Sequence, residues 1–165
     1  VIVERLVEEG VDLEATNDEG STALMKAAFH GRADCLEYLI DKGANLDAAD
    51  KGGYTALMYA VDKREMDCIA QSTLTSRSSS PTLLASGANV HAVERGNRTA
   101  LHLAAISGNV PCIETLLKAG ADPSHKNEND KTPLEIAKER AEIIPDKYAE
   151  AAKLLEAAVA AQQPE

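Results

Sequence analysis

The chain has few aromatic residues and fewer basic than acidic ones, and these shortages narrow the classes of protein it can belong to. Aromatic side chains make up 3% of its 165 residues, and tryptophan is absent. Most of the apolar material is therefore Ala, Leu, Ile and Val, which suits thin helices that pack closely. Lysine and arginine number 17, against 27 aspartates and glutamates. Binding to nucleic acid or to an anionic membrane needs a clustered basic face, so we expect neither.

The negative charge is unevenly distributed along the chain. Residues 1–50 hold 12 acidic and 4 basic residues, whereas residues 51–100 hold 4 acidic and 6 basic ones. The middle third therefore suits an acidic peptide better than the ends do.

Cysteines and long apolar runs are also scarce. The three cysteines, Cys35, Cys68 and Cys112, are odd in number and far apart. A disulfide framework is usually denser and even-numbered, so we expect a reducing compartment, namely the cytoplasm, with the nucleus as the alternative. No run approaches the roughly 18 apolar residues that would indicate a membrane span.

A tetrapeptide that begins with threonine recurs along the chain. It starts at Thr22, Thr55, Thr99 and Thr132, with spacings of 33, 44 and 33 residues. The agreement extends further, because each of the three cysteines lies thirteen residues after a threonine. Self-similarity at a period of 20–50 residues indicates a repeat architecture.

Each repeated position has a physical role. The threonine stands where a helix begins, and its hydroxyl can cap exposed backbone N–H groups. Small residues such as Ala27 and Ala104 follow, and they allow neighbouring helices to approach closely. Gly43, Gly87 and Gly120 stand just past the second apolar segment, where a positive φ ends a helix at little cost. Each unit is therefore predicted as turn, short helix, turn, longer helix and loop, and only stacking can bury its apolar face.

The runs Gly20-Ser21-Thr22-Ala23-Leu24, Thr99-Ala100-Leu101-His102-Leu103-Ala104-Ala105 and Leu116-Leu117-Lys118-Ala119-Gly120-Ala121-Asp122 resemble the ankyrin repeat family. The resemblance implies an all-α solenoid of stacked helix-turn-helix units with short β-hairpin-like turns, forming a single domain over residues 1–165. Residues 1–16 resemble a partial repeat, and three repeats follow at 17–49, 50–93 and 94–126. Residues 127–165 resemble a closing repeat, in which Pro145 ends one helix and Asp146 begins a long final one.

The middle repeat is longer than the others by 11 residues, which we assign to an insertion at 72–82 in its second helix region. Eight of these residues are Ser or Thr, which are unfavourable inside helices. We expect a loop there, with Ser80 capping a short resumed helix that Pro81 opens. The plain interpretation is a tolerated surface insertion. The sharper one is a regulatory loop, because Ser80 precedes a proline and follows Arg77 by three residues, a context that suits phosphorylation.

Catalytic chemistry finds little support in the sequence. The cysteines occupy equivalent positions on three second helices, so we expect them to pack in the core. No CxxC or HExxH spacing occurs, and no nucleophile is paired with a histidine. His102 fits the family's Thr-x-Leu-His pattern and is expected to be structural. We therefore expect no enzyme, no metal site and no cofactor.

The resemblance implies that partners dock on the concave face, formed by the turn tips and the exposed side of each first helix. Carried over to this sequence, the partner-binding residues are Phe29, His30, Lys51, Tyr54, Lys63, Arg95, Arg98, Ile106, Lys131 and Arg140.

Basic residues of the two central repeats surround Tyr54 and Ile106, and Tyr and Arg are favoured interface anchors. We therefore predict a monomeric scaffold that binds an acidic, partly apolar protein or peptide segment over these repeats. We also predict that reversing the charge of Arg95 and Arg98 together abolishes this binding. The alternative is a regulatory or structural segment of a larger channel, enzyme or effector, with mainly intramolecular contacts.

Overall fold

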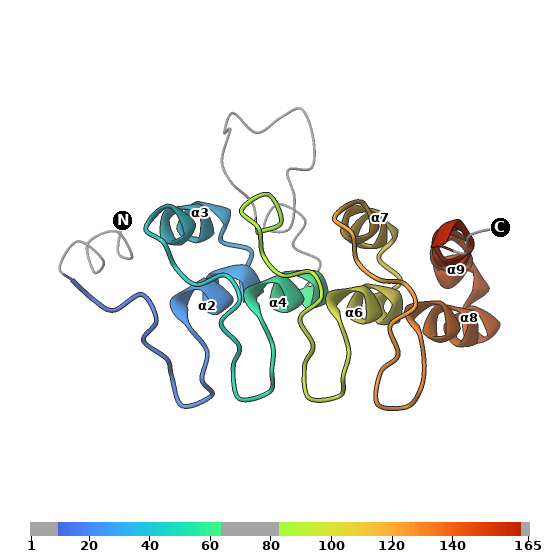
Figure 1. Ribbon diagram of the computed structural model, residues 1–165, viewed down its shortest axis with the longest axis horizontal. Helices are drawn as coiled ribbons and strands as arrows, with labels where there is room; N and C mark the ends of the chain where they lie inside the picture. The colour runs from blue at the N-terminus through green and yellow to red at the C-terminus, as the bar shows by residue number, and fades with distance from the viewer. Residues whose placement is uncertain (1–9, 64–82, 163–165) are drawn as a thin grey trace. The chain divides into compact units, whose positions relative to one another are not determined.

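The computed structural model describes residues 10–63 and 83–162. The chain divides into two compact units, Val1–Asn89 and Val90–Glu165. Figure 1 labels the helices of each unit. The described ranges hold seven α-helices and no strand, which confirms the all-α class. The first unit contains α2 (Ala23–Phe29), α3 (Ala33–Asp41) and α4 (Ala56–Lys63). The second contains α6 (Ala100–Ser107), α7 (Val110–Lys118), α8 (Pro133–Ile143) and α9 (Pro145–Gln162).

The recurring threonines start the first helices, as predicted. The hydroxyl oxygen of Thr22 accepts a hydrogen bond from the backbone N–H of Met25 at 3.4 Å, and Thr55 accepts one from Met58 at the same distance. Thr132 and Glu135 form a reciprocal pair, because the Glu135 carboxylate also accepts the Thr132 backbone N–H at 2.7 Å. That bond holds the pKa of Glu135 below its usual value.

Left-handed residues stand where the repeat pattern predicts them. Gly43, Gly87 and Gly120 have φ values of 87°, 91° and 87°, and Gly43 and Gly120 follow α3 and α7, which confirms their role after these second helices. Asn97 and Asp130, the residues that stand in place of glycine in the later turns, have φ values of 56° and 59°. Asn and Asp tolerate this region better than other residues with a side chain, so the turns keep their shape without glycine.

Small and branched apolar residues fill the cores of both units. In the first unit α2 packs against α3 and α4, and in the second α6 packs against α7 and α8. Ala28, Ala60, Ala104 and Ala105 are fully buried at these contacts, so the helices approach closely. Larger side chains from the second helices complete the cores, among them Leu36, Leu39, Ile113 and Leu116.

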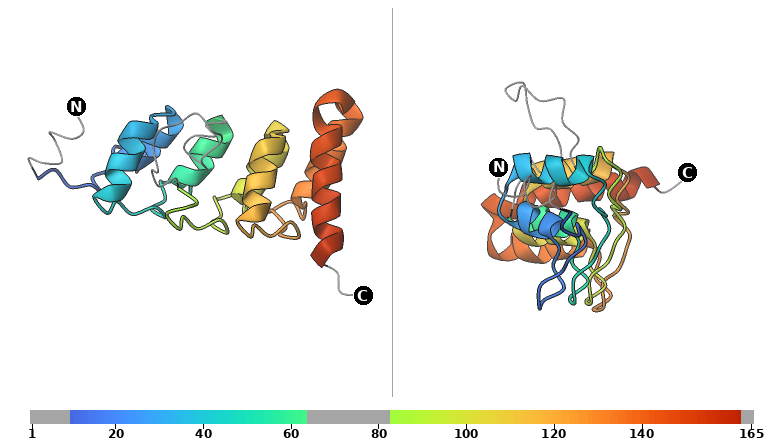
Figure 2. Two further views of the ribbon diagram at one scale, coloured as in Figure 1. Left: turned by 90° about the horizontal axis from the view of Figure 1, so that it is seen from above. Right: turned by 90° about the vertical axis from the view of Figure 1, so that its left-hand side faces the viewer.

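The long final helix covers the end of the second unit. Figure 2 shows α9 beside α7, and α9 contacts both α7 and α8. Tyr148, Ala151 and Leu155 are buried on its inner face. As expected, Pro145 marks the change of direction, although it is the first residue of α9, where its missing N–H costs nothing.

Two predictions about the second helices need correction. Cys112 is fully buried as expected, but Cys35 is only half-buried. Residues 83–87 are turns, so the resumed helix does not extend over them. Cys68 and Ser80, with the rest of the 72–82 insertion, lie outside the described residues.

Candidate functional site

Four hairpin turns precede the recurring threonines, and each is held by one side chain. Five residues before the threonine, a side-chain oxygen accepts two backbone N–H groups, from the residues two and four positions later, at 2.8–3.2 Å. These acceptors are Asn17, Asp50, Glu94 and Asn127. The sequence analysis missed them, although a carboxylate or amide at this fixed offset in all four repeats is the signal that reveals them.

Hairpins of the same unit are also joined to each other. The N–H of Lys51 donates to the carbonyl of Glu19, and the N–H of Glu128 donates to the carbonyl of Gly96, both at 3.0 Å. In the second unit the Asn97 side chain adds a bond to the Lys126 carbonyl at 2.7 Å. The tips are therefore fixed platforms for the side chains they carry.

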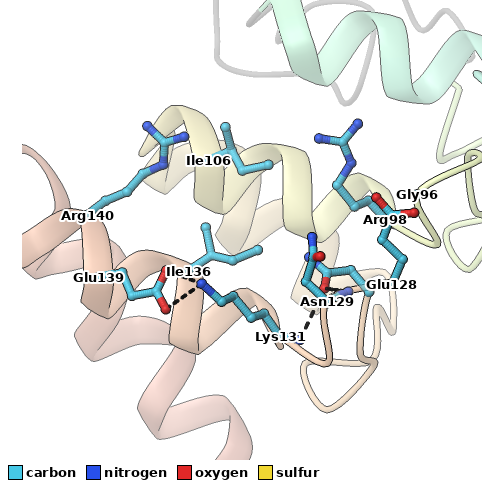
Figure 3. Close-up of a pocket in the computed structure, with 10 residues that line it drawn as sticks. Gly96, Arg98, Ile106, Glu128, Asn129, Lys131, Ile136, Glu139 and Arg140 are labelled. Carbon is cyan, nitrogen blue, oxygen red and sulfur yellow. Dashed lines mark hydrogen bonds and ion pairs between the residues drawn. The ribbon is translucent and has the colours of Figure 1, made fainter.

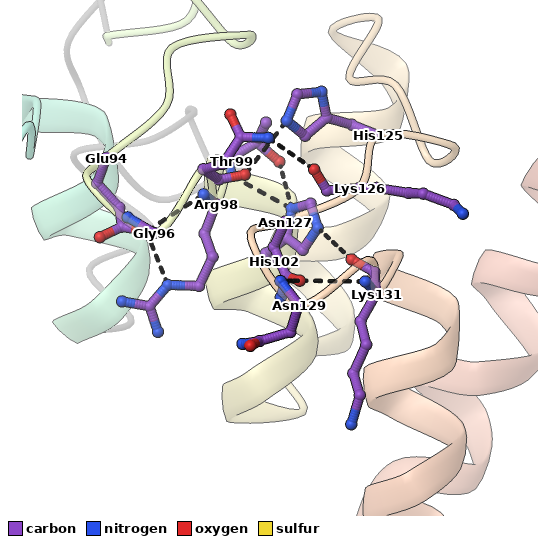
Figure 4. Close-up of polar contacts among 11 residues, drawn as sticks. Glu94, Gly96, Arg98, Thr99, His102, His125, Lys126, Asn127, Asn129 and Lys131 are labelled. Atoms are coloured by element: carbon purple, nitrogen blue, oxygen red, sulfur yellow. Dashed lines mark hydrogen bonds and ion pairs between the residues drawn. The ribbon is translucent and has the colours of Figure 1, made fainter.

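His102 ties α6 to the next hairpin (Figure 4). Its Nδ1 lies 3.2 Å from the backbone N of Thr99, and its Nε2 lies 3.1 Å from the Lys131 carbonyl oxygen. A carbonyl only accepts, so Nε2 carries the proton and Nδ1 accepts from Thr99. The side chain is fully buried, and this burial lowers the pKa of His102. The structural role expected for His102 is confirmed.

This environment makes stability depend on pH. The unfolded chain binds a proton at His102 near pH 6.5, whereas the folded chain resists it, so the free energy of unfolding should fall as pH drops below about 6.5. The steepest contribution of one such group is about 1.4 kcal/mol per pH unit. We expect His102→Leu to be less stable than wild type by about 1–3 kcal/mol at pH 7.5 and to show a shallower decline toward pH 5. Urea unfolding across this range checks the expectation, and parallel curves for the two proteins would contradict it.

An aromatic cluster lies in the first unit, between α2, α4 and the hairpin that carries Tyr54. The Phe29 and Tyr59 ring centroids are 5.7 Å apart, and those of Tyr54 and Tyr59 are 5.3 Å apart. The Lys63 ammonium lies 4.5 Å from the Phe29 ring centroid. Tyr59 donates its hydroxyl hydrogen to Asp50, and burial together with this carboxylate raises the pKa of Tyr59 to about 12. The aromatic rings thus pack against one another, and the Lys63 ammonium lies over the Phe29 ring.

The second unit has a pocket of about 310 Å³ between two hairpins and the helices that follow them (Figure 3). Half-buried Ile106 and buried Ile136 supply its apolar surface. The remaining lining residues are polar: Gly96, Arg98, Asn127, Glu128, Asn129, Lys131, Glu139 and Arg140. Five of the ten lining residues are charged, so the pocket is more polar than a typical small-molecule site and suits a charged segment of a larger partner better.

The charges around this pocket differ in how firmly they are held. Arg98 Nε donates to the Glu94 carboxylate at 2.8 Å. Burial opposes ionisation of Glu94, yet the hydrogen bonds from Arg98 and Gly96 outweigh it and hold the pKa of Glu94 below its usual value. Lys131 forms an exposed pair with Glu139 at 2.7 Å. The Arg140 guanidinium lies 5.9 Å from the Tyr148 ring centroid.

The two sites gather most of the residues predicted from the sequence. The pocket brings together Arg98, Ile106, Lys131 and Arg140. In the first unit Phe29 contacts His30 and Lys63, while Tyr54 reaches the cluster through Tyr59. The exposed side chains of Lys51 and Arg95 stand on hairpin tips and line neither feature.

Tyr59 and Ile136 were not among the predicted residues, although both stand four residues after a recurring threonine. Each lies one helical turn before a predicted residue, Lys63 or Arg140, and therefore on the same face of its helix. Helical periodicity is the signal that could have found them. Glu139 also lines the pocket and was not among the predicted binding residues.

Candidate metal-binding clusters and membrane-spanning helices are both absent from the described parts of the chain. In residues 10–63 and 83–162, no group of three or more His, Cys, Asp or Glu side chains could hold a metal ion. Within the same ranges no helix combines the length and the apolar character that crossing a bilayer requires.

Comparison with known proteins identifies one family. A family model described as ankyrin repeats, in three copies, matches residues 1–71 and 77–159. No curated protein matches the chain significantly. The family match covers nearly the whole chain, including both hairpins that form the pocket.

Proposed function

Because the chain belongs to the ankyrin repeat family, we propose that it is a protein-interaction module whose pocket in the second unit binds an acidic, partly apolar segment of another protein. Ankyrin repeats generally mediate protein–protein interaction, and the family is typically non-catalytic. The pocket is the observation that carries the proposal, since it places two isoleucines beside three cations and two carboxylates on hairpins held by hydrogen bonds.

The chemistry of the lining favours a carboxylate-bearing partner. Three cations, Arg98, Lys131 and Arg140, face two carboxylates, Glu128 and Glu139, so the lining has a formal surplus of one positive charge. The charge of Arg98 is already offset by Glu94. Lys131 is paired with exposed Glu139, whereas the Glu94 partner of Arg98 is buried, so Lys131 and Arg140 are the cations that a partner's carboxylate can reach. Ile106 and Ile136 offer area for an apolar side chain.

This distribution changes the choice of test residues. Reversing Arg98 would place a second carboxylate beside buried Glu94 and would disturb the hairpin itself. Lys131 and Arg140 are better sites, because the Arg140 residue is exposed, the Lys131 side chain is 42% exposed, and replacing them leaves the hairpin's backbone bonds in place.

We expect the double variant Lys131→Glu/Arg140→Glu to lose the partner. The immobilised protein would be compared with the variant in native cell extract, with captured proteins quantified by mass spectrometry. A protein retained by the wild type should drop at least tenfold on the variant, because like charges then meet across the interface.

A matched control separates the pocket from net charge. Lys118→Glu/Lys153→Glu makes the same charge change at exposed sites on α7 and α9 that do not line the pocket. The control should retain the wild-type partners. If both double variants, verified as folded by circular dichroism, capture the same proteins as the wild type, the proposal is wrong.

A further inference from the structure

The Lys131–Glu139 ion pair lies within the proposed binding pocket. Its side chains are 42% and 54% exposed, and they come from different elements, the hairpin and α8 (Figure 3). The dashed contact in the figure joins the Lys131 ammonium to the Glu139 carboxylate beside Ile136. One of the pocket's principal cations is therefore already neutralised by the protein itself.

An exposed ion pair of this kind contributes little to folding stability, because water and salt screen it and two long side chains lose freedom in forming it. Exchanging one carboxylate for another at Lys131 consequently costs little. Glu94 differs, since its side chain is 5% exposed and it accepts bonds from Gly96 N, Arg98 N and Arg98 Nε. Glu94 is fixed, whereas Glu139 can be replaced.

We propose that Glu139 occupies the subsite for a partner's carboxylate and is displaced when the partner binds. The inference rests on the proposed function and names the group recognised at this place in the pocket. Glu139 is then a specificity-determining residue. A ligand carboxylate can replace Glu139 as the partner of Lys131, whereas a neutral ligand side chain cannot, so Glu139 keeps its contact with Lys131.

The chain offers a close control for this idea. Lys138 and Glu156 form an ion pair with the same 2.7 Å distance and with side chains 51% and 61% exposed, between α8 and α9 and outside the pocket lining. Glu139→Gln and Glu156→Gln remove the same charge from similar pairs. Only Glu139→Gln also removes a competitor for Lys131.

The probe is a fluorescein-labelled heptapeptide of alternating glutamate and leucine, with a glutamine-for-glutamate counterpart. We expect Glu139→Gln to bind the acidic peptide about two- to fivefold more tightly than Glu156→Gln, which corresponds to about 0.4–1 kcal/mol. The gain should disappear in a Lys131→Gln background, because the cation that both carboxylates share is then gone.

The outcomes separate this inference from the proposed function. Equal affinities for Glu139→Gln and Glu156→Gln, with acidic-peptide binding that still depends on Lys131 and Arg140, would overturn the inference and leave the proposed function standing. An acidic peptide that binds no better than its glutamine counterpart to the wild type and to all variants, up to millimolar concentration, would overturn both. Tighter binding by Glu139→Gln that persists without Lys131 would also contradict the displacement.

Discussion

Replacing Tyr148 by alanine should lower the free energy of unfolding by about 3–5 kcal/mol, the range for deleting a buried aromatic side chain. The Tyr148 side chain is 3% exposed, and its hydroxyl donates to the carbonyl of Ile106 at 3.1 Å. That carbonyl belongs to the last turn of α6, where the helix itself supplies no partner. Tyr148 thus fills the space between two repeats and also caps the helix that carries Ile106 into the pocket.

Tyr148→Phe is the control that separates packing from the hydrogen bond. It keeps the ring and removes only the hydroxyl, so we expect a loss of about 0.5–1.5 kcal/mol. Urea denaturation followed by circular dichroism measures both variants. A loss under 1.5 kcal/mol for the alanine variant would mean that α9 does not pack on the second unit as described.

Gly108→Ala should lower the free energy of unfolding by about 2–5 kcal/mol, because a backbone cost and a packing cost add. Gly108 has a φ of 65°, a region that an L-residue with a side chain occupies at a cost of roughly 1–2 kcal/mol. A Cβ atom there would also lie 2.8 and 2.9 Å from two carbons of the Tyr148 ring, and relieving such overpacking typically costs about 1–3 kcal/mol.

Gly120→Ala isolates the backbone part of this cost. Gly120 has a φ of 87°, yet a Cβ atom added to it meets no other atom within 4 Å. We therefore expect a loss of roughly 1–2 kcal/mol there. Thermal or urea unfolding of both variants gives the comparison, and equal losses at the two glycines would show that Tyr148 does not pack against Gly108.

The double variant Gly108→Ala/Tyr148→Ala should lose less stability than the sum of the two single variants. Without the Tyr148 ring, the Cβ atom at position 108 no longer clashes with it.

The repeat architecture could be predicted from sequence because its determinants are local. A threonine caps the helix that follows it by accepting the backbone N–H three residues later. A glycine or asparagine turns the chain through its own positive φ. Both signals can therefore be found from residue type and spacing alone. The start of α8 at Thr132 and the left-handed turn at Asn97 follow directly from such residues. The same logic located the long closing helix after Pro145.

The pairing of charges in the pocket could not be predicted, because it depends on where side chains from different elements point. Sequence analysis selected Arg98 as a binding residue, and the structure ties it to Glu94 within the hairpin. The equivalent acceptor, five residues before the threonine, is Asn in two other repeats and Asp in a third. The additional contact of Glu94 with an arginine side chain is therefore specific to this hairpin. Likewise Glu139 meets Lys131 only through the fold.

Photo-cross-linking from the pocket tests the central claim most directly. A benzophenone side chain introduced at Asn129, an exposed residue of the pocket lining, would be compared with one at Ala157, an exposed position on α9 outside the lining. On irradiation in native cell extract, we expect a discrete cross-linked partner from position 129 and none of that mass from position 157. Excess acidic peptide should suppress the product. Identical cross-linking patterns from the two positions, or a product unaffected by the peptide, would contradict the assignment of this pocket as the partner-binding site.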